Sequence, residues 1–172
     1  MRHTVVFVGL LSGLLTVSVA TAQEKKPAPG PRQFTLAAGV GNAMGWFGMQ
    51  GEKYFRQGRI SVLAGLGYTP ELDSGDANGV AVAAGARAFT GGIKHRGFIE
   101  LSVSQLAVEQ ACFEVCSRPY GPGVQLGYQF VTLGGFTFYV SGGVGRVFRP
   151  AAGLGGWWGM GGLGFGYTWR RH

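Results

Sequence analysis

Charged residues are scarce in this chain of 172 residues: they make up 13% of the sequence, whereas an average soluble domain has about 25%. The chain also holds only 2 cysteines and 3 histidines, which leaves few candidates for disulfides, metal ligands or catalytic bases. After the first 22 residues, no uninterrupted apolar stretch reaches the ~20 residues of a membrane-spanning helix. At 46% hydrophobic residues, the chain is nevertheless too apolar to be disordered.

Glycine and aromatic residues are abundant instead. There are 33 glycines, well above the ~7% of an average protein, together with 12 phenylalanines, 6 tyrosines and 4 tryptophans. The length fits a single domain, and the rings supply ample apolar surface to bury. Because charge is so scarce, lipid has to be considered as the solvent for part of that surface.

The first 22 residues have the features of a cleaved signal peptide. A basic start at Arg2 and His3 precedes an apolar stretch from Val5 to Val19, and Ala20-Thr21-Ala22 supplies the small residues that a signal peptidase requires. The apolar stretch is too short to span a membrane as a helix. We therefore predict export, a mature chain that begins at Gln23, and a polar, proline-rich leader over residues 23–32.

From Gln33 onward, apolar residues recur with a period of two, and polar or turn-forming clusters separate the runs. Each run is about as long as the 9–11 residues that a tilted strand needs to cross hydrocarbon. The eight predicted strands are Gln33–Gly41, Trp46–Phe55, Arg59–Tyr68, Gly79–Phe89, Gly97–Ala107, Gly123–Val131, Phe136–Val147 and Trp157–Trp169. The predicted fold is an all-β, closed, eight-stranded antiparallel up-and-down barrel over residues 33–172.

The two faces of the predicted strands differ in side-chain size. In the sixth strand, Leu126 faces away from Gln125 and Gly127. Glycine, serine, threonine and glutamine cannot form a dry core, but they fit the narrow interior of an eight-stranded barrel. The bulky face must then meet lipid, as in a transmembrane barrel. Four residues break the alternation: Trp46, Lys53, Leu63 and Phe98.

The last strand carries a family resemblance. Its bulky positions are Leu163, Phe165, Tyr167 and Trp169. This alternating series resembles the terminal-strand assembly signal of bacterial outer-membrane proteins, and with eight strands and a signal peptide the chain is similar to the small OmpA/OmpX-like barrels. The resemblance implies insertion into the outer membrane with the help of periplasmic chaperones and the barrel-assembly machinery. Unlike that family, the chain continues past the aromatic residue through 170–172.

The family orientation would place both termini and three short turns in the periplasm. The turns are predicted at 56–58, 90–96 and 132–135, and the outer connections at 42–45, 69–78, 108–121 and 148–156. Much of the basic charge falls on the periplasmic side. These cations are scattered over turns and ends, so we expect no nucleic-acid partner. Attraction to the anionic headgroups of outer-membrane lipids or plain solvation explains them.

Three groups of residues are candidate sites. Cys112 and Cys116 lie close together in one predicted outer connection of an exported chain, which favours a disulfide. Glu52, Arg87 and Glu100 are predicted to face the interior, where buried charges require partners, so we expect an ion-paired network. A proton path or narrow pore is the alternative for these three. The tryptophans are expected to form interfacial girdles: Trp46, Trp157, Trp158 and Trp169.

No catalytic, cofactor-binding or metal-binding residues are predicted. The histidines lie in the signal peptide, in a turn and at the C-terminus, and they form no recognisable serine-histidine-acid set. The leading interpretation is therefore a non-enzymatic outer-membrane barrel with a structural or surface-interaction role, with a minor solute path and an unidentified extracellular ligand left open. The alternatives are a soluble, secreted, lipocalin-like barrel and an enzyme that modifies lipid A.

Overall fold

The computed structural model of the protein describes residues 30–69, 79–106, 120–148 and 156–171. They form eight strands and one short 3-10 turn, η1 (Arg56–Gly58). The strands are β1 (Arg32–Gly41), β2 (Gly45–Phe55), β3 (Ile60–Thr69), β4 (Gly79–Gly91), β5 (His95–Gln105), β6 (Tyr120–Val131), β7 (Phe136–Arg146) and β8 (Trp157–Arg170). The predicted strand boundaries agree closely; the largest shift is at β6, which begins at Tyr120 rather than at Gly123.

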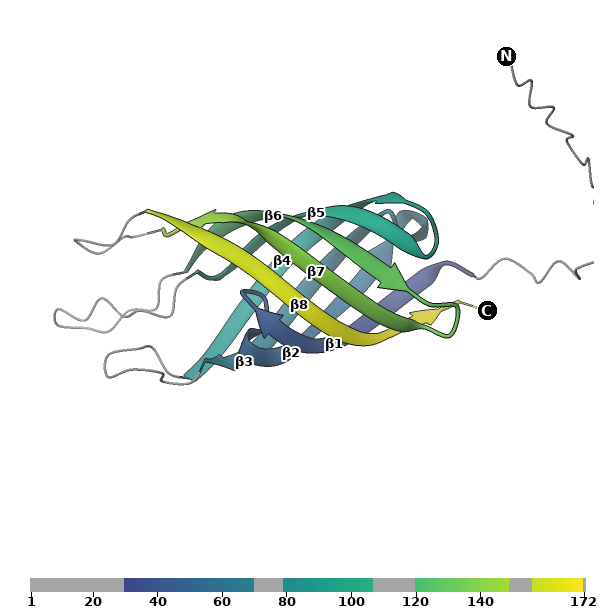
Figure 1. Cartoon of the computed structure of the whole chain (residues 1–172), viewed down its shortest axis with the longest axis horizontal. Helices are drawn as coiled ribbons and strands as arrows, with labels where there is room; N and C mark the ends of the chain where they lie inside the picture. Colours follow the sequence, from purple (N-terminus) through teal and green to yellow (C-terminus); the bar gives the residue numbers. More distant parts are fainter. Residues whose placement is uncertain (1–29, 70–78, 107–119, 149–155, 172) are drawn as a thin grey trace, which may run out of the picture.

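The strands follow one another around a closed antiparallel barrel (Figure 1). Each strand pairs with the next in sequence, and β1 pairs with β8 to close the sheet, with Ala37 opposite Gly166. The β1–β8 register also brings Arg32 opposite Arg170, so the strand ends nearest the two termini share one end of the barrel. The predicted all-β, up-and-down fold is confirmed. Among the described residues, no helix is both long enough and apolar enough to cross a membrane.

The end of the barrel that holds β1's start and β8's end also holds the tight connections, and we call it the turn end. It includes η1, the β4–β5 turn and the β6–β7 turn. The opposite end, the loop end, holds the β1–β2 turn and the strand ends that flank residues 70–78, 107–119 and 149–155. Those three stretches and residues 1–29 lie outside the described residues, as do the predicted signal peptide and most of the leader.

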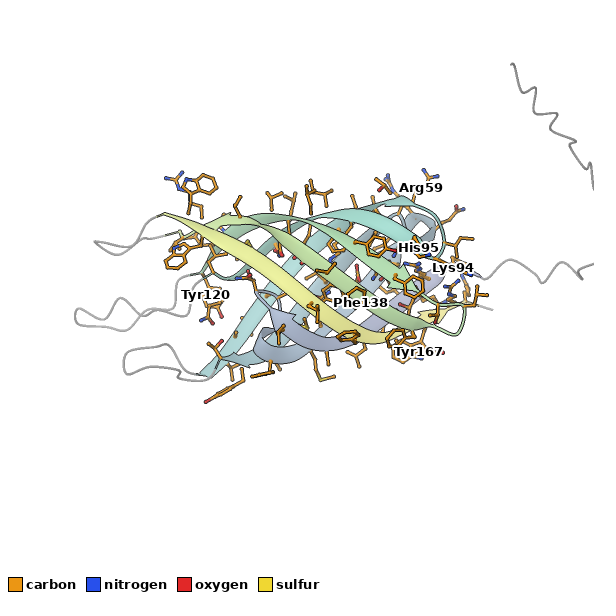
Figure 2. All side chains as sticks on the ribbon, viewed as in Figure 1. Arg59, Lys94, His95, Tyr120, Phe138 and Tyr167 are labelled. Carbon is orange, nitrogen blue, oxygen red and sulfur yellow. The ribbon has the colours of Figure 1, made fainter. Side chains whose placement is uncertain are left out.

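Bulky apolar side chains cover the outside of the barrel, as Figure 2 shows around its circumference. Leu126 is 67% exposed and Leu101 is 59% exposed, although both lie in mid-strand. The inside is lined by polar groups, and Glu52 and Glu100 are almost completely buried. Leu63 and Phe98, which break the alternation of residue types, follow the strand geometry and point inward. The predicted division of the two faces is therefore present in the structure.

The β1–β2 turn differs from the simple outer connection that the sequence predicts, because it folds back into the barrel. Met44 is 1% exposed. The Asn42 side chain donates to the Gln105 carbonyl oxygen at 2.9 Å and accepts from the Gly161 amide at 2.8 Å. These bonds fix the turn to β5 and β8. Gly65 and Gly67 on β3 provide the space, since a Cβ at either position would overlap a backbone carbonyl of the turn.

Candidate functional site in the barrel interior

Arg87 on β4 forms the centre of a buried ionic cluster. Its Nη1 lies 3.3 Å from Glu52 Oε2, and its Nη2 lies 2.7 Å from Glu100 Oε2. All three side chains are about 1% exposed or less. They come from β2, β4 and β5, and each occupies an inward position of its strand. The structure thus brings together the three charged residues that the sequence predicts for the interior.

Two aromatic rings and one amide complete the surroundings of the Arg87 guanidinium. Its Cζ atom lies 4.5 Å from the Phe98 ring centroid and 4.8 Å from that of Tyr139. Both distances are within the range of cation–π attraction. The Gln50 amide lies between Arg87 and Tyr139, and it satisfies both when its oxygen faces Arg87 Nη1 at 3.0 Å and its nitrogen faces the Tyr139 hydroxyl at 3.1 Å.

The two glutamates are also hydrogen-bonded to neutral groups. Glu52 accepts from the Ser61 hydroxyl at 2.5 Å and from the Tyr54 hydroxyl at 2.8 Å. Glu100 accepts from Gln125 Nε2 at 3.1 Å. Buried ions cost several kcal/mol each when their hydrogen-bonding capacity is unmet. The additional donors therefore offset the desolvation that the ion pairs alone would leave.

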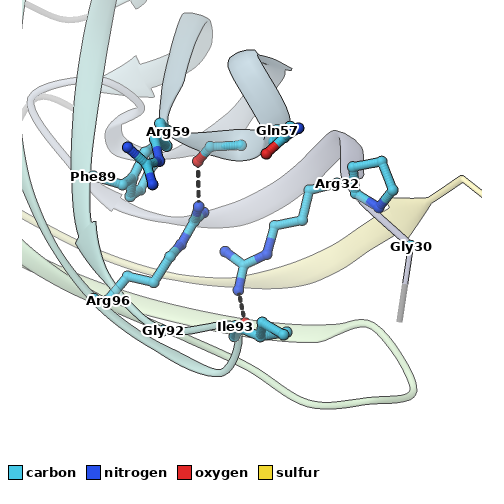
Figure 3. Close-up of a pocket in the computed structure, with 11 residues that line it drawn as sticks. Gly30, Arg32, Gln57, Arg59, Phe89, Gly92, Ile93 and Arg96 are labelled. Carbon is cyan, nitrogen blue, oxygen red and sulfur yellow. Dashed lines mark hydrogen bonds between the residues drawn. The ribbon is translucent and has the colours of Figure 1, made fainter. Parts of the chain in front are cut away.

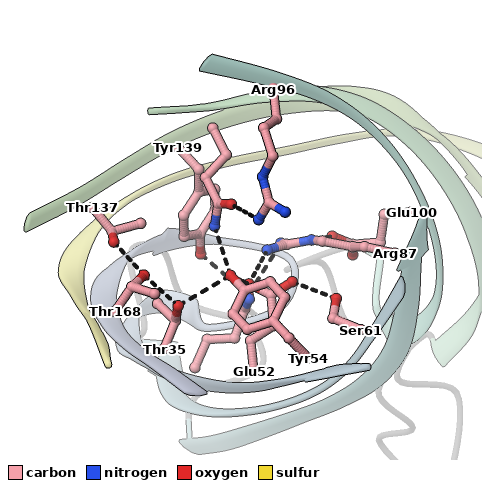
Figure 4. A network of polar contacts seen from close by, with 12 residues as sticks. Thr35, Glu52, Tyr54, Ser61, Arg87, Arg96, Glu100, Thr137, Tyr139 and Thr168 are labelled. Carbon is pink, nitrogen blue, oxygen red and sulfur yellow. Dashed lines mark hydrogen bonds and ion pairs between the residues drawn. The ribbon is translucent and has the colours of Figure 1, made fainter. Parts of the chain in front are cut away.

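A ladder of hydroxyl groups extends the cluster around the barrel (Figure 4). Thr35 Oγ1 on β1 lies 3.0 Å from the Tyr54 hydroxyl and 2.6 Å from Thr168 Oγ1 on β8. Thr168 Oγ1 lies 2.5 Å from Thr137 Oγ1 on β7. Tyr54 also accepts from Gln129 Nε2 on β6 at 3.0 Å. Side chains from all eight strands therefore join one polar network, which connects the strands across the interior of the barrel.

The turn end of the interior carries two further arginines, Arg32 on β1 and Arg96 on β5 (Figure 3). Arg32 Nη1 donates to Gln129 Oε1 at 2.9 Å, and Arg96 Nη2 donates to the same oxygen at 2.6 Å. Arg96 Nη1 donates to the Gly58 carbonyl oxygen at 2.5 Å. Arg32 also donates to the Ile93 carbonyl oxygen. A cavity of about 390 Å³ opens beside both side chains.

Apolar side chains and the inward β1–β2 turn fill the loop end. Leu106, Val147 and Met160 form a buried cluster, and Trp158 packs against it. In a second buried cluster, Met44 packs with Ala37, Phe98 and Tyr139. The free space between this turn and the Arg87 cluster is about 10 Å³, which is room for no more than about one water molecule. In the described part of the barrel, the Arg87 cluster is therefore closely packed against the β1–β2 turn.

The remaining predicted site residues are distributed as follows. Trp157 and Trp169 lie exposed on the outside at opposite ends of β8. Trp158 instead faces inward, because it is offset from Trp157 and Trp169 by an odd number of residues. The prediction that it belongs to a girdle is therefore wrong. Trp46 belongs to β2, but its side chain lies outside the described residues, as do Cys112 and Cys116. The bulky series on β8 lies on the outer face: Leu163, Phe165, Tyr167 and Trp169.

The sequence patterns do not identify three residues of the network. The sequence places Arg32 in the leader and Arg96 in a turn, because the predicted strands begin one residue and two residues too late. Tyr54 was not singled out, although it shares the inward phase of Gln50 and Glu52 on β2. Continuation of the two-residue period would have placed Tyr54 and Arg96 inward. It would not have found Arg32, which has the parity of the outward Phe34 and is buried only because the β1–β8 register shifts between these two residues.

Two further sources of functional information are candidate metal sites and similarity to known proteins. In the described part of the chain, no group of three or more histidine, cysteine or acidic residues is placed to hold a metal ion. Comparisons of the chain with protein-family models, curated proteins and solved structures found no match. The geometry and chemistry of the barrel itself are therefore the basis for assigning a function.

Proposed function

We propose that the protein is an integral outer-membrane β-barrel with a filled interior and a structural or surface-interaction role. The observation that carries this proposal is the chemistry of the outer surface. Among the outward-facing residues of the described strands, lysine and arginine occur only as Lys53 and Arg146, each within two residues of a strand end, and no acidic residue occurs. An apolar band without charge between two polar ends is what a bilayer requires of a barrel.

The two ends of the apolar band support the same proposal. Exposed aromatic residues occur near both ends, where membrane proteins concentrate rings that contact both lipid and water. At the turn end they are Phe34, Phe55, Phe136, Tyr167 and Trp169. At the loop end they are Phe47, Tyr68, Phe148 and Trp157. Exposed cations at the turn end are suited to anionic headgroups: Arg56, Arg59, Lys94 and Arg171.

The interior favours a structural role over ligand storage or solute passage. A soluble lipocalin-like barrel holds its ligand in a cavity lined by apolar groups, whereas this interior is occupied by ion pairs, amides and hydroxyls. The space between the Arg87 cluster and the β1–β2 turn is only about 10 Å³, which supports a filled interior over a solute path. What remains accessible is the surface at the two ends of the barrel, and the proposed surface interactions take place there.

Membrane fractionation tests the proposal directly. The full chain is expressed in a Gram-negative host, and the envelope is washed with high salt and then with alkaline carbonate. We expect the protein to stay with the outer-membrane fraction through both washes and to need detergent for release, because its apolar exterior is solvated by acyl chains. Recovery of the folded protein in the periplasmic fraction or in the salt wash would instead support the soluble barrel.

A further inference from the structure

Arg32 and Arg96 form a pair of like charges at the turn end that no carboxylate in the described structure neutralises directly. Both side chains are more than nine-tenths buried, with relative exposures of 7% and 6%. Both donate to one acceptor, Gln129 Oε1, which holds the two guanidinium groups next to each other. Repulsion between charges this close is substantial where water is largely excluded. An amide oxygen is neutral and cannot balance it.

The other partners of the two arginines are neutral as well. Arg96 donates to the Gly58 carbonyl oxygen, and its Cζ atom lies 3.8 Å from the Phe89 ring centroid. Its Nε has no hydrogen-bond partner although it is buried. Arg32 donates to the Ile93 carbonyl oxygen. These contacts hold both side chains in place and leave donor capacity unused.

The glutamates of the interior are already committed elsewhere. Glu52 and Glu100 both pair with Arg87 and accept additional hydrogen bonds. Arg170, opposite Arg32 in the β1–β8 register, adds a third arginine at this end, and its Nε and Nη1 have no partner. Among the inward-facing residues of the described strands, four arginines therefore accompany two glutamates, and the positive excess lies at the turn end.

The cavity beside these arginines lies at the turn end of the barrel (Figure 3). The cavity has a volume of about 390 Å³. It is lined by Arg32, Arg59 and Arg96, by Phe89 and by the glycine-rich β4–β5 turn. The space is larger than an inorganic anion needs and lies within the lower range of small-molecule sites, which begins at about 300 Å³. An anionic group with a small organic substituent fits it.

We propose that this cavity is a binding site for a phosphate monoester. Guanidinium groups bind oxyanions through parallel N–H···O bonds, which are stronger than neutral hydrogen bonds. A phosphate monoester carries a charge of about −1.5 to −2 at neutral pH, so it balances two arginines, whereas a carboxylate balances one. Phe89 and Ile93 provide apolar contacts for the substituent. The site does not depend on what surrounds the outer face of the barrel.

Calorimetric titration of the folded full chain in a neutral glycoside detergent tests the site. The probes are inorganic phosphate and glycerol 3-phosphate at constant ionic strength, with acetate for comparison. We expect saturable binding at one site, and at least about tenfold weaker binding of acetate, which corresponds to about 1.4 kcal/mol. Dioctanoyl phosphatidic acid identifies the source of the group: tighter binding than glycerol 3-phosphate indicates a lipid headgroup, and equal or weaker binding indicates a soluble ester.

Two variants with the same change in charge separate a site from general attraction of anions. R32Q/R96Q should weaken phosphate binding at least about tenfold, whereas K53Q/R146Q, which alters the outer face, should leave it unchanged. Circular dichroism verifies folding, and R32Q alone, with an expected loss of about threefold or more, replaces the double variant if that fails to fold. Absence of saturable phosphate binding, or equal losses in both double variants, would overturn the proposal.

Discussion

Arg87 is the residue on which the order of the interior most depends, because in the described structure it is the one cation that forms ion pairs with the two buried glutamates. The three residues come from three different strands. Removing one partner of a buried ion pair leaves the other charge buried and unpaired, at the full desolvation cost. Replacing the whole group by uncharged residues can leave the free energy of unfolding nearly unchanged. We therefore expect the ionic cluster to contribute more to the unique packing of the interior than to net stability.

Substitution of Arg87 should accordingly be costly, and the cost should be recoverable. We expect R87M to lower the free energy of unfolding by about 3–5 kcal/mol, measured by urea titration in lipid vesicles with tryptophan fluorescence. The triple variant E52Q/R87M/E100Q should recover most of that loss, because no charge remains unpaired. A triple variant as unstable as R87M would mean that packing, and not charge, determines the effect.

The sequence identifies some of the important inward residues and not others. Glu52, Arg87 and Glu100 were predicted because a charge in the small-residue phase of a strand is conspicuous. Tyr54 carries an equally important hydroxyl, yet a tyrosine in an aromatic-rich strand is not conspicuous by its type. Arg32 and Arg96 lie at strand ends, where the two-residue period gives the least information about whether a residue belongs to strand or turn.

At the scale of elements, the β1–β2 turn is the feature that local sequence describes least well. Its length predicts a short connection, and it is one, but its inward fold depends on glycines in another strand. Gly65 and Gly67 of β3 leave the space that the Ala43 and Met44 carbonyls occupy. The turn then contributes Met44 to the interior and is held by Asn42. Contacts between elements therefore determine the position of this turn.

Alanine substitutions of two strand glycines test the arrangement of the turn. We expect G65A to lower the free energy of unfolding by about 1–3 kcal/mol, the usual cost of overpacking, because its Cβ would overlap the Ala43 carbonyl oxygen. The control is G159A on β8, where a Cβ meets no atom within 4 Å, and its effect should stay within about 0.5 kcal/mol. Equal effects in the same urea titration would show that the turn does not occupy this space.

For the molecule as a whole, closure of the sheet and the polarity of its two faces are linked. Closure through β1 and β8 leaves no strand edge unpaired, which lets the outer face be apolar without leaving backbone groups unsatisfied. The interior of an eight-stranded barrel is narrow, so side chains fill it, and here they are mostly polar. A barrel of this composition pairs most of its inward polar groups internally, apart from donors such as Arg96 Nε, and leaves its apolar surface to the surroundings.

A charge placed on the outer face should reveal those surroundings. We expect L126R, in the middle of β6, to cost about 2–4 kcal/mol, and I60R, at the turn end of β3, to cost about 0–1 kcal/mol, if acyl chains cover the barrel with the depth dependence of a bilayer. Both costs are measured from reversible urea unfolding in lipid vesicles. Leu126 is 67% exposed and Ile60 is 36% exposed, so in water neither arginine should matter, and small equal effects would contradict a lipid-facing surface.

The sequence by itself determined the number of strands, their approximate limits and the side of each strand that carries bulky residues. These properties follow from a two-residue period that local sequence encodes directly. Only the tertiary structure decided which inward side chains meet, because closing the sheet brings residues from distant strands to one axis. The inward turn, the single network that joins all eight strands and the arginine-lined cavity at the turn end all arise from that closure.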